Sequence, residues 1–355
     1  MRVLQVMAGA AQGGAETAFQ DIVLALSAAG LSQKVVMRPN NPERVAAFRA
    51  AGIPVETLPF GGALDIYTPW KMKKIIADFQ PDIVQTWMSR ATHKTPHCPA
   101  AAAKPYLRVA RLGGYYGLKY YKGVDYFIAN TPDIREYLIQ KSVAPDHVVT
   151  LHNFATEDCP VTTIRRADLG TPEDATVVLA LARYHPVKGL DVLIRSVVDM
   201  ENVHLWLAGE GPEEQNLKAL AADLGIAHRA HFLGWCTDRA ALLHAADICV
   251  IPSRHEPFGN VFIQAWAQKT PVVCSRSQGP LQYVRDGEDG ILFDIDNVAQ
   301  LRAALERLIT HPDQAQTMAE AGYIRYQEEF SRDRVVARYL DFYQKILNAE
   351  GRMAA

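Results

Sequence analysis

The stretch DICVIPSRHEPFGNVFIQAWAQKTPVVCS, residues 247–275, decides the fold. Its two short apolar runs, residues 248–251 and 272–275, are typical of buried strands, and residues 261–269 between them have helical spacing. A strand, a helix and a second strand in this order predict two parallel strands joined by a crossover helix. The loop before the helix carries Glu256, an acid for which packing provides no purpose.

The same alternation extends outward from this stretch in both directions. Apolar strands alternate with amphipathic helices from residue 2 to about residue 150, and the alternation restarts near residue 176. Residues 155–176 are polar and poorly periodic, which predicts a linker and the entry to a second domain. The chain of 355 residues therefore predicts an α/β protein with two Rossmann-like, doubly wound domains in tandem, residues 1–160 and 165–330, and a cleft between them.

Composition restricts the class of protein. The apolar segment at residues 1–10 is too short for a signal peptide and is soon followed by Gly13 and Gly14. No stretch approaches the ~18 apolar residues of a membrane helix. The five cysteines are scattered and form no C-x-x-C pair, which favours a reducing, cytoplasmic location. The net charge of -2 combines +6 in residues 1–166 with -8 in residues 167–355, either because the two halves have different partners or by chance drift. No feature predicts a nucleic-acid partner.

A glycine-rich turn, GAAQGGAE, joins the first strand to the first helix at residues 9–16. Gly13 and Gly14 allow backbone N–H groups to approach an anion at the start of the helix, although a tight turn alone also accounts for them. The spacing is neither G-x-G-x-x-G nor that of a P-loop, and no acid ends the second strand. NAD is therefore not an expected ligand.

Charged side chains and glycine turns follow several strands of the second domain. Arg183 ends a strand and Lys188 begins the next helix, so the two cations either clamp a diphosphate or are merely solvated. Gly209 and Glu210 follow another strand, Glu256 a third, and residues 277–280 a fourth. Because the carboxyl ends of parallel strands share one edge, all of these segments are expected to converge there.

Together these motifs resemble the family 4 glycosyltransferases of the two-Rossmann-domain (GT-B) type, over essentially the whole chain. The resemblance depends on QGGAE (12–16), ARYHPVKGLDVLI (182–194), LAGEGP (207–212), HFLGW (231–235), ADICVIPSRHEPFGN (246–260) and TPVVCS (270–275). It implies that the second domain binds a UDP- or GDP-sugar and the first an acceptor. It also implies transfer of a hexose with retention of anomeric configuration, no metal or other cofactor, and a final helix, residues 331–355, that returns to the first domain.

The resemblance also assigns residues. Arg183, Lys188 and Glu256 would be catalytic, the cations stabilising the departing diphosphate and the carboxylate contacting the transferred sugar. The family's second glutamate, a ribose ligand, is replaced by Gln264, which is expected to weaken donor binding by about 1 kcal/mol, or roughly fivefold. The remaining donor-binding residues would be Gly13, Gly14, Gly209, Glu210, Trp235, Phe258, Gly259, Asn260 and Val261.

The first domain departs from the family at a histidine. Many relatives have one at the end of the strand that corresponds to residues 107–114, and this chain has none there, so that His93 is the nearest candidate. The resemblance implies that the departing phosphate takes the acceptor's proton, so the reaction does not require a histidine base. A metal site at His93, His97 and Cys98 is not expected because Pro96 breaks the helix that would align them.

Aromatic and basic residues predict where the acceptor binds. Residues 111–123 combine tyrosines, lysines and glycines, and WKMKK (70–74) adds basic surface. Such side chains stack on sugars and attract anionic head groups, which favours a glycan or lipid-linked acceptor and contact with the inner face of the cytoplasmic membrane. A flexible loop beside a solvated helix is the alternative. The candidate acceptor-binding residues are Arg90, His93, Tyr115, Tyr116 and Lys119.

Other interpretations remain open at this stage. A sugar-nucleotide epimerase with a similar scaffold would convert the donor without an acceptor, and an inert sugar-nucleotide-binding partner is conceivable because of Gln264 and the absent histidine. No pattern supports a pyridoxal-phosphate phosphorylase. The D-x-D at residues 294–296 follows a strand and precedes a helix, so Asp296 is expected to be a helix N-cap rather than a metal ligand. The resemblance to the family implies a role in bacterial lipopolysaccharide or surface polysaccharide biosynthesis.

Overall fold

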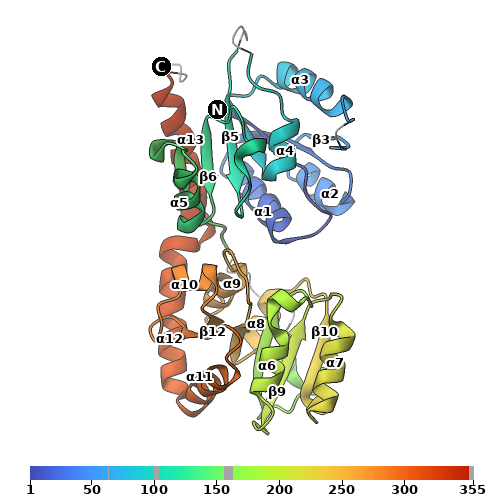
Figure 1. Cartoon of the computed structure of the whole chain (residues 1–355), viewed down its shortest axis with the longest axis vertical. Coiled ribbons are helices and arrows are strands. Elements are labelled where there is room, and N and C mark those ends of the chain that lie inside the picture. The colour runs from blue at the N-terminus through green and yellow to red at the C-terminus, as the bar shows by residue number, and fades with distance from the viewer. Residues whose placement is uncertain (63, 100–103, 156–162, 352–355) are drawn as a thin grey trace. The chain divides into compact units, whose positions relative to one another are not determined.

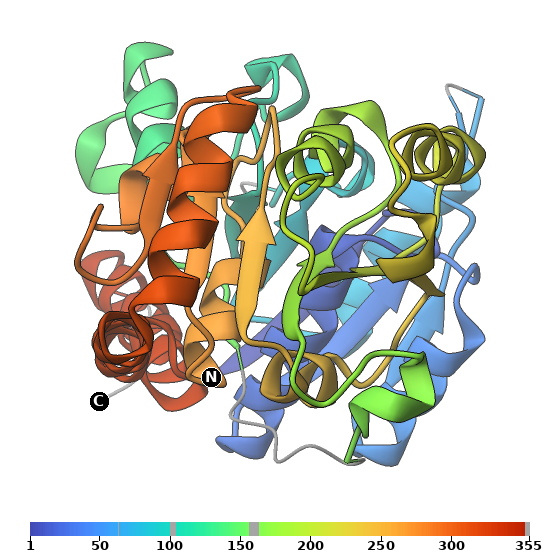
Figure 2. The same cartoon turned by 90° about the horizontal axis from the view of Figure 1, so that it is seen from below.

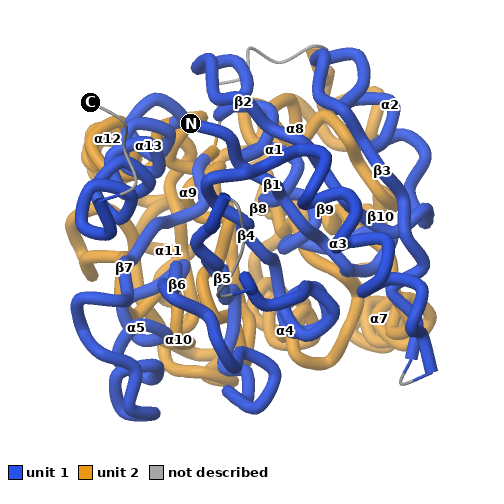
Figure 3. Tube along the Cα trace, turned by 90° about the horizontal axis from the view of Figure 1, so that it is seen from above, with its two compact units in different colours: residues 1–154, 332–355 blue, residues 155–331 orange. Residues whose placement is uncertain are grey.

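Strands and helices alternate through the computed structural model, which describes residues 1–62, 64–99, 104–155 and 163–351 (Figure 1, Figure 2). The chain divides into two compact units, coloured separately in Figure 3. Unit 1 consists of Met1–Phe154 and the segment from Arg332 onward, and unit 2 is Ala155–Ser331. Residues 156–162, which include Cys159 and part of the predicted linker, lie outside the described residues.

Unit 1 contains a parallel sheet of seven described strands in the order β3-β2-β1-β4-β5-β6-β7. Strands β4 and β5 are buried along their whole length, and β1 is buried from Val3 onward, as expected for a sheet covered on both faces. The strands are β1 (Arg2–Met7), β2 (Ser32–Met37), β3 (Val55–Thr57), β4 (Ile83–Trp87), β5 (Leu107–Leu112), β6 (Tyr126–Ala129) and β7 (Val148–Thr150).

Two helices of unit 1, α2 and α5, begin at residues that the sequence signals. Asn41 caps α2 by accepting a hydrogen bond from Arg44 N, and Thr131 caps α5 in the same way. Proline follows each cap at the first helical position, where no N–H is required. The helices are α1 (Gly14–Ala28), α2 (Pro42–Ala50), α3 (Tyr67–Phe79), α4 (Met88–Lys94), α5 (Pro132–Gln140) and α13 (Arg332–Ala349), with short turns η1 (Leu118–Tyr120) and η2 (Pro145–His147).

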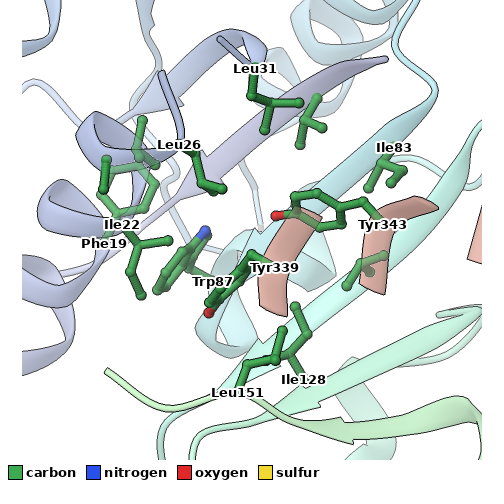
Figure 4. Close-up of a cluster of buried hydrophobic side chains, with 14 of the residues drawn as sticks. Phe19, Ile22, Leu26, Leu31, Ile83, Trp87, Ile128, Leu151, Tyr339 and Tyr343 are labelled. Atoms are coloured by element: carbon green, nitrogen blue, oxygen red, sulfur yellow. The ribbon is translucent and has the colours of Figure 1, made fainter. Parts of the chain in front are cut away.

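The C-terminal helix α13 completes the core of unit 1 (Figure 4). Its Tyr339 and Tyr343 are fully buried in a cluster with Phe19 of α1 and Trp87 of β4. Both phenols find partners, because Tyr343 donates to Gln85 Oε1 at 2.7 Å and the Tyr339 oxygen accepts from Arg111 Nε at 2.9 Å. These buried polar contacts fix the register of a helix that lies more than 200 residues away in sequence.

Unit 2 contains a second parallel sheet, with six described strands in the order β10-β9-β8-β11-β12-β13. From β8 the chain proceeds through β9 to β10 on one side, and then returns to place β11, β12 and β13 on the other. The strands are β8 (Thr176–Leu181), β9 (Val203–Ala208), β10 (Ala230–Gly234), β11 (Ile248–Ile251), β12 (Val272–Ser275) and β13 (Ile291–Phe293).

Helices cover both faces of the unit 2 sheet (Figure 2). One apolar cluster joins the sheet to α6, α7, α11 and α12, and the other joins the opposite face to α8, α9 and η6. The predicted α/β fold with two parallel sheets is therefore confirmed. The elements are η3 (Arg166–Leu169), η4 (Pro186–Lys188), α6 (Leu190–Ser196), α7 (Glu214–Asp223), η5 (Ala227–Arg229), α8 (Arg239–Ala245), α9 (Asn260–Ala267), α10 (Gln278–Tyr283), α11 (Val298–Thr310), α12 (Pro312–Arg325) and η6 (Tyr326–Phe330).

One predicted cap is wrong. Asn297, not Asp296, is the N-cap of α11, and its side chain accepts from Gln300 N. Asp296 instead has a left-handed backbone, with φ of 63°, and its carboxylate pairs with Arg254 at 2.7 Å.

Cys249 and Cys274 are fully buried as predicted, and burial raises the pKa of the Cys249 thiol to about 12. In the described part of the chain, no helix has the length and hydrophobicity needed to cross a membrane.

Candidate functional site

The candidate site of unit 2 lies where the chain reverses its direction across the sheet. Strands β8 and β11 are neighbours, and the connections that follow them proceed to opposite sides. Two adjacent strand ends whose loops diverge create a crevice in doubly wound sheets, and ligands bind there. The loop after β8 carries Arg183 and Lys188, and the loop after β11 carries Glu256.

Lys188 and Glu256 meet directly at this point. Lys188 Nζ lies 2.6 Å from Glu256 Oε2, and their side chains are 24% and 18% exposed. Gly189 makes the approach possible, because its φ is 63° and a Cβ there would lie 2.1 Å from the Pro252 carbonyl oxygen. Only glycine tolerates both the left-handed backbone and the close contact. The two loops are thus held together by backbone geometry as well as by charge.

Arg254 joins the same two loops from the side. Its guanidinium donates to both carboxylate oxygens of Asp191 at 3.0 and 2.8 Å, and to Asp296 Oδ1 at 2.7 Å. Its backbone N–H donates to the Val187 carbonyl at 2.8 Å. The hydrogen bond with Asp191 raises the pKa of Arg254. The guanidinium fork thus ties the loop before Glu256 to the first turn of α6, and the backbone hydrogen bond ties it to the residue before Lys188.

The turn after β12 supports Glu256 from the other side. Gly279 N donates to the Glu256 carbonyl at 2.6 Å, and Glu256 N donates to Gln278 Oε1 at 3.3 Å. A Cβ at Gly279 would lie 2.0 Å from the Phe258 carbonyl, so this turn packs directly against the Glu256 loop. Residues 277–280, predicted as a glycine turn, form the beginning of helix α10, which the sequence pattern does not predict.

Gly209 and Glu210 connect the ends of β8, β9 and β10. A Cβ at Gly209 would lie 2.0 Å from the Ala182 carbonyl, and the Glu210 carbonyl accepts from Tyr184 N at 2.9 Å. Glu210 Oε1 accepts from Trp235 N at 3.3 Å. The Trp235 ring is 48% exposed at this edge. The structure therefore brings these predicted donor-binding residues to the same sheet edge as the β8 loop.

Arg183 presents an unpaired cation at this edge. Its side chain is exposed, and among the residues that the structure describes it has no hydrogen-bond or ion-pair partner. Its neighbour Tyr184 is buried and donates to the Leu207 carbonyl at 2.6 Å, which anchors the loop. A free guanidinium beside an anchored loop is suited to an anionic ligand.

The turn at Phe258 and Gly259 leads into helix α9, which contains Gln264. Gly259 has φ of 98°, and α9 begins at Asn260, with Val261 partly exposed in its first turn. The ring of Phe258 packs into the core, 5.3 Å from the Tyr283 ring, so this residue contributes through its backbone and by anchoring the turn. Gln264 Oε1 is buried and has no hydrogen-bond partner in the described structure. That atom is an acceptor without a donor.

The glycine turn of unit 1 holds a carboxylate of the chain itself. Glu16 is 5% exposed, and its Oε1 accepts from Ala10 N at 2.8 Å. A Cβ at Gly9 or Gly13 would lie 2.3 or 2.4 Å from the Glu16 carboxylate, so these glycines make room for it. The carboxylate of Glu16 therefore occupies the position at the start of α1 where the glycine turn predicts an anion.

The predicted acceptor-binding residues of unit 1 form two groups. His93, in the last turn of α4, and Lys119 of η1 both contact the Tyr120 ring. The ring centroids of His93 and Tyr120 lie 5.7 Å apart, and Lys119 Nζ lies 5.0 Å from the Tyr120 centroid. Tyr115 and Tyr116 instead contact Tyr137 of α5, by an edge-on ring contact at 5.4 Å and a hydrogen bond of 3.0 Å to the Tyr116 carbonyl. Arg90 is exposed on α4.

A buried polar cluster at the ends of β5, β6 and β7 is not predicted by the sequence analysis. Arg111 is 2% exposed, stacks on the Trp87 ring at 4.5 Å and donates to Asn153 Oδ1. Asn130 is also buried, and its Oδ1 has no hydrogen-bond partner among the residues that the structure describes. Its carbonyl lies 3.2 Å from His152 Nδ1. His152 is thus a histidine at a strand end of unit 1, after β7 rather than after the predicted strand at residues 107–114.

His97 and Cys98 have structural contacts. His97 Nδ1 lies 2.8 Å from a nitrogen of Arg108, whose charge adds to desolvation in lowering the pKa of His97. Cys98 Sγ accepts from Tyr106 N at 3.4 Å. Across the described ranges, no group of three or more potential metal-ligating side chains is found.

Comparisons with known proteins give consistent results for both units. The family described as "Glycosyl transferases group 1" matches residues 161–325, and "Glycosyltransferase Family 4" matches residues 12–158. The chain is 35% identical over 329 residues to the lipopolysaccharide core biosynthesis glycosyltransferase LpsE of Rhizobium meliloti, covering 92% of this chain and 95% of that one. It is 33% identical over 346 residues to LpsD of the same organism, covering 97% and 98%.

Solved structures share the fold at lower identity. The Anabaena protein HepE in complex with UDP superposes with a TM-score of 0.84 at 20% identity, covering 97% of this chain and 100% of that one. The same protein in complex with UDP-glucose gives a TM-score of 0.80 at 20% identity, covering 96% and 99%. At this identity the likeness concerns the architecture of the two parallel sheets.

Proposed function

Because this chain belongs to the group 1 and family 4 glycosyltransferases, we propose that it transfers a hexose from a UDP- or GDP-sugar to a glycan or lipid-linked glycan, with retention of configuration. The observation that carries the proposal is the meeting of Lys188 and Glu256 at the reversal point of the unit 2 sheet, with the exposed Arg183 in the same loop as Lys188. A diphosphate and a sugar require cations and a carboxylate in such proximity.

The donor's diphosphate is proposed to bind Arg183 and Lys188. An ammonium group has three N–H donors, and Glu256 uses one of those of Lys188, so two remain for phosphate oxygens. Arg183 adds a planar fork with no competing partner in the described residues. Both cations stabilise the negative charge that grows on the diphosphate as the glycosidic bond breaks.

Gln264 is proposed to bind the ribose. Its buried Oε1 has no donor in the described structure, and a ribose hydroxyl would supply one. A buried acceptor left unsatisfied costs about 1–3 kcal/mol, and satisfying it favours ligand binding by part of that amount. The replacement of the family's glutamate therefore keeps an acceptor in position and removes only its charge.

The reaction is proposed to occur on one face of the sugar. The bond between the anomeric carbon and the leaving phosphate oxygen breaks, and a bond from the acceptor hydroxyl oxygen forms to the same carbon on the same side. The hydroxyl proton passes to the departing phosphate oxygen. Glu256 accepts hydrogen bonds from sugar hydroxyls and orients the ring, so no enzyme base is required. We propose that Arg183 and Lys188 provide the charge that a metal supplies in other transferases.

The substrates are inferred from the relatives. The two curated relatives act in lipopolysaccharide core biosynthesis, and HepE binds UDP and UDP-glucose. We therefore infer a lipopolysaccharide core or related surface glycan as acceptor and UDP-glucose as the first donor to test. The residues of unit 1 proposed to contact the acceptor are Arg90, His93, Tyr115, Tyr116 and Lys119, whereas Gly13 and Gly14 at the start of α1 are proposed to contact the donor.

A thermal-shift panel of UDP, GDP and their sugars tests the donor proposal. A ligand at ~100 times its Kd adds about 2.7 kcal/mol to the free energy of unfolding, which raises the melting temperature visibly. The nucleotide that stabilises the protein is then incubated with labelled sugar and lipopolysaccharide core, with and without EDTA. NMR of the product's anomeric proton distinguishes retention from inversion.

The same panel separates the alternatives. An epimer formed from the donor in the absence of acceptor would identify an epimerase. Binding without any turnover, with or without acceptor, would identify an inert sugar-nucleotide-binding protein. If no nucleotide or nucleotide sugar raises the melting temperature, the proposal is wrong.

A further inference from the structure

Four large apolar side chains are exposed together at the start of α3. Leu64 is 95% exposed, Ile66 84%, Trp70 62% and Tyr67 51%. The rings of Tyr67 and Trp70 lie 6.0 Å apart, so two of the four are in direct contact. Single exposed apolar residues are ordinary, but a group of this size and exposure on one short segment indicates an interaction surface.

The segment is held in this conformation from beneath. The Asp65 carboxylate accepts from Gly61 N at 2.7 Å, Thr68 N at 2.9 Å and Thr68 Oγ1 at 2.6 Å. Lys94 Nζ, on the neighbouring α4, donates to the Gly62 and Asp65 carbonyls at 2.8 and 2.9 Å. The apolar side chains are therefore presented by a fixed turn.

Helix α3 has one buried face and one exposed basic face. Met72, Ile75 and Ile76 pack into the core of unit 1, while Lys73 and Lys74 are exposed and Lys71 partly so. Trp70 and Lys74 are four residues apart, which places the aromatic ring and the ammonium on the same side of the helix. The acids of this segment are Asp65, which is engaged in the turn, and Asp78, in the last turn of the helix.

We propose that Leu64, Ile66, Tyr67 and Trp70, with Lys71, Lys73 and Lys74, form a docking surface for an anionic lipid bilayer. Aromatic rings and aliphatic side chains enter the boundary between head groups and acyl chains, and lysines beside them attract anionic head groups. Each lysine near an anionic leaflet contributes roughly fivefold in affinity. This inference extends beyond the proposed transfer reaction and does not depend on it.

Flotation with vesicles of defined composition tests the proposal. The full chain is mixed at low ionic strength with two kinds of vesicle. One contains phosphatidylcholine alone, and the other contains phosphatidylcholine with about 30 mol percent of the anionic lipid phosphatidylglycerol. We expect flotation with the anionic vesicles and release at high salt, because exposed charges are screened. Brominated acyl chains should quench the fluorescence of Trp70, and this quenching should be lost in Trp70→Ser.

Two variants separate the apolar and electrostatic contributions. Ile66→Ser/Trp70→Ser should reduce binding at least tenfold, and Lys71→Gln/Lys73→Gln/Lys74→Gln should reduce binding to anionic vesicles by at least tenfold. The matched control is Leu281→Ser/Ile324→Ser, which removes two exposed apolar side chains of unit 2 and should float like the original chain. Circular dichroism checks that each variant folds, and UDP binding by calorimetry shows separately whether the donor proposal holds.

Three results would overturn the proposal. The first is the absence of flotation with anionic vesicles at low salt. The second is an equal loss of binding in the unit 2 control. The third is a concentration-dependent dimer in sedimentation that Trp70→Ser abolishes, because that result would assign the surface to a second copy of the chain.

Discussion

Lys188 Nζ lies 2.6 Å from Glu256 Oε2, across 68 residues of sequence, where strands β8 and β11 end side by side. The pair is only partly exposed, at 24% and 18%. Removing one partner therefore leaves the other in a half-buried position without its counter-charge, which costs more than breaking an exposed ion pair. Because the two side chains contact each other, a ligand that binds both of them must lie next to this ion pair.

Lys188→Ala is expected to reduce transfer about 10- to 100-fold, because one charge-assisted bond to the diphosphate is lost. Glu256→Ala should also be severe, and the double variant should lose less than the product of the two single losses, since the residues are in contact. Steady-state kinetics of the three variants measures this coupling. Lys218→Ala, which breaks an exposed pair with Glu214, is the matched control. Strictly multiplicative losses would show that the contact has no functional role.

Arg183→Ala is expected to reduce transfer about 10- to 100-fold while leaving the free energy of unfolding within about 0.5 kcal/mol. The side chain is exposed and has no partner in the described structure, so its removal disturbs no internal contact. Urea unfolding and kinetics of the same preparation separate the two effects, with Arg285→Ala as an exposed arginine control. Near-normal turnover in Arg183→Ala would remove the arginine from the donor site.

Gln264→Glu is expected to keep or raise donor affinity, by up to about fivefold, because a charged acceptor binds a ribose hydroxyl more strongly than a neutral one. Gln264→Leu, which is similar in size and lacks the acceptor, should weaken binding instead. Calorimetry with the nucleotide identified by thermal shift measures both. A tenfold fall in affinity for Gln264→Glu would place the ribose elsewhere.

Arg254 is expected to be a positioning residue that acts through Lys188 and Glu256. Arg254→Ala should reduce kcat about three- to tenfold, because the fork to Asp191 and Asp296 holds the two loops together. Arg254→Lys should recover only part of the rate, since an ammonium cannot reproduce the fork. In the Arg254→Ala background, Lys188→Ala should cost less than it does alone. An unchanged cost, measured by the same kinetics, would indicate a purely structural role.

The sequence predicted those parts of unit 2 that periodicity encodes. Residues 248–251 and 272–275 form β11 and β12, and the helix between them begins at Asn260, just after the predicted glycine turn. The resemblance to the family supplied the roles that are proposed for Arg183, Lys188 and Glu256. Alternation of apolar runs is a local signal, and it sufficed for a fold in which each strand, helix and turn is locally consistent.

Contacts between distant residues could not be predicted in this way. The pairing of Lys188 with Glu256 depends on the close approach of Gly189 to Pro252, and the fork of Arg254 depends on two loops from different strands. Asp296 shows the same limit, because a partner in space changed its role from cap to ion pair. Side-chain pairing across a sheet edge follows from register and loop geometry, which hydrophobic periodicity does not specify.

The stability of unit 2 is expected to fall as the pH is lowered below about 6.5, the ordinary pKa of histidine. His204 Nδ1 and His231 Nε2 lie 3.0 Å apart with stacked rings, and desolvation lowers the pKa of both, with the charges of His231 and Arg229 adding to the effect at His204. A histidine with a lowered pKa in the folded state takes up its proton later than in the unfolded state. The unfolded chain therefore binds more protons as the pH falls, and stability present above about 6.5 is lost. Replacing His204 with Gln should make the urea midpoint less dependent on pH between about 7.5 and 5.5, where histidine titrates. A slope identical to that of the original chain would show that this pair does not carry the dependence.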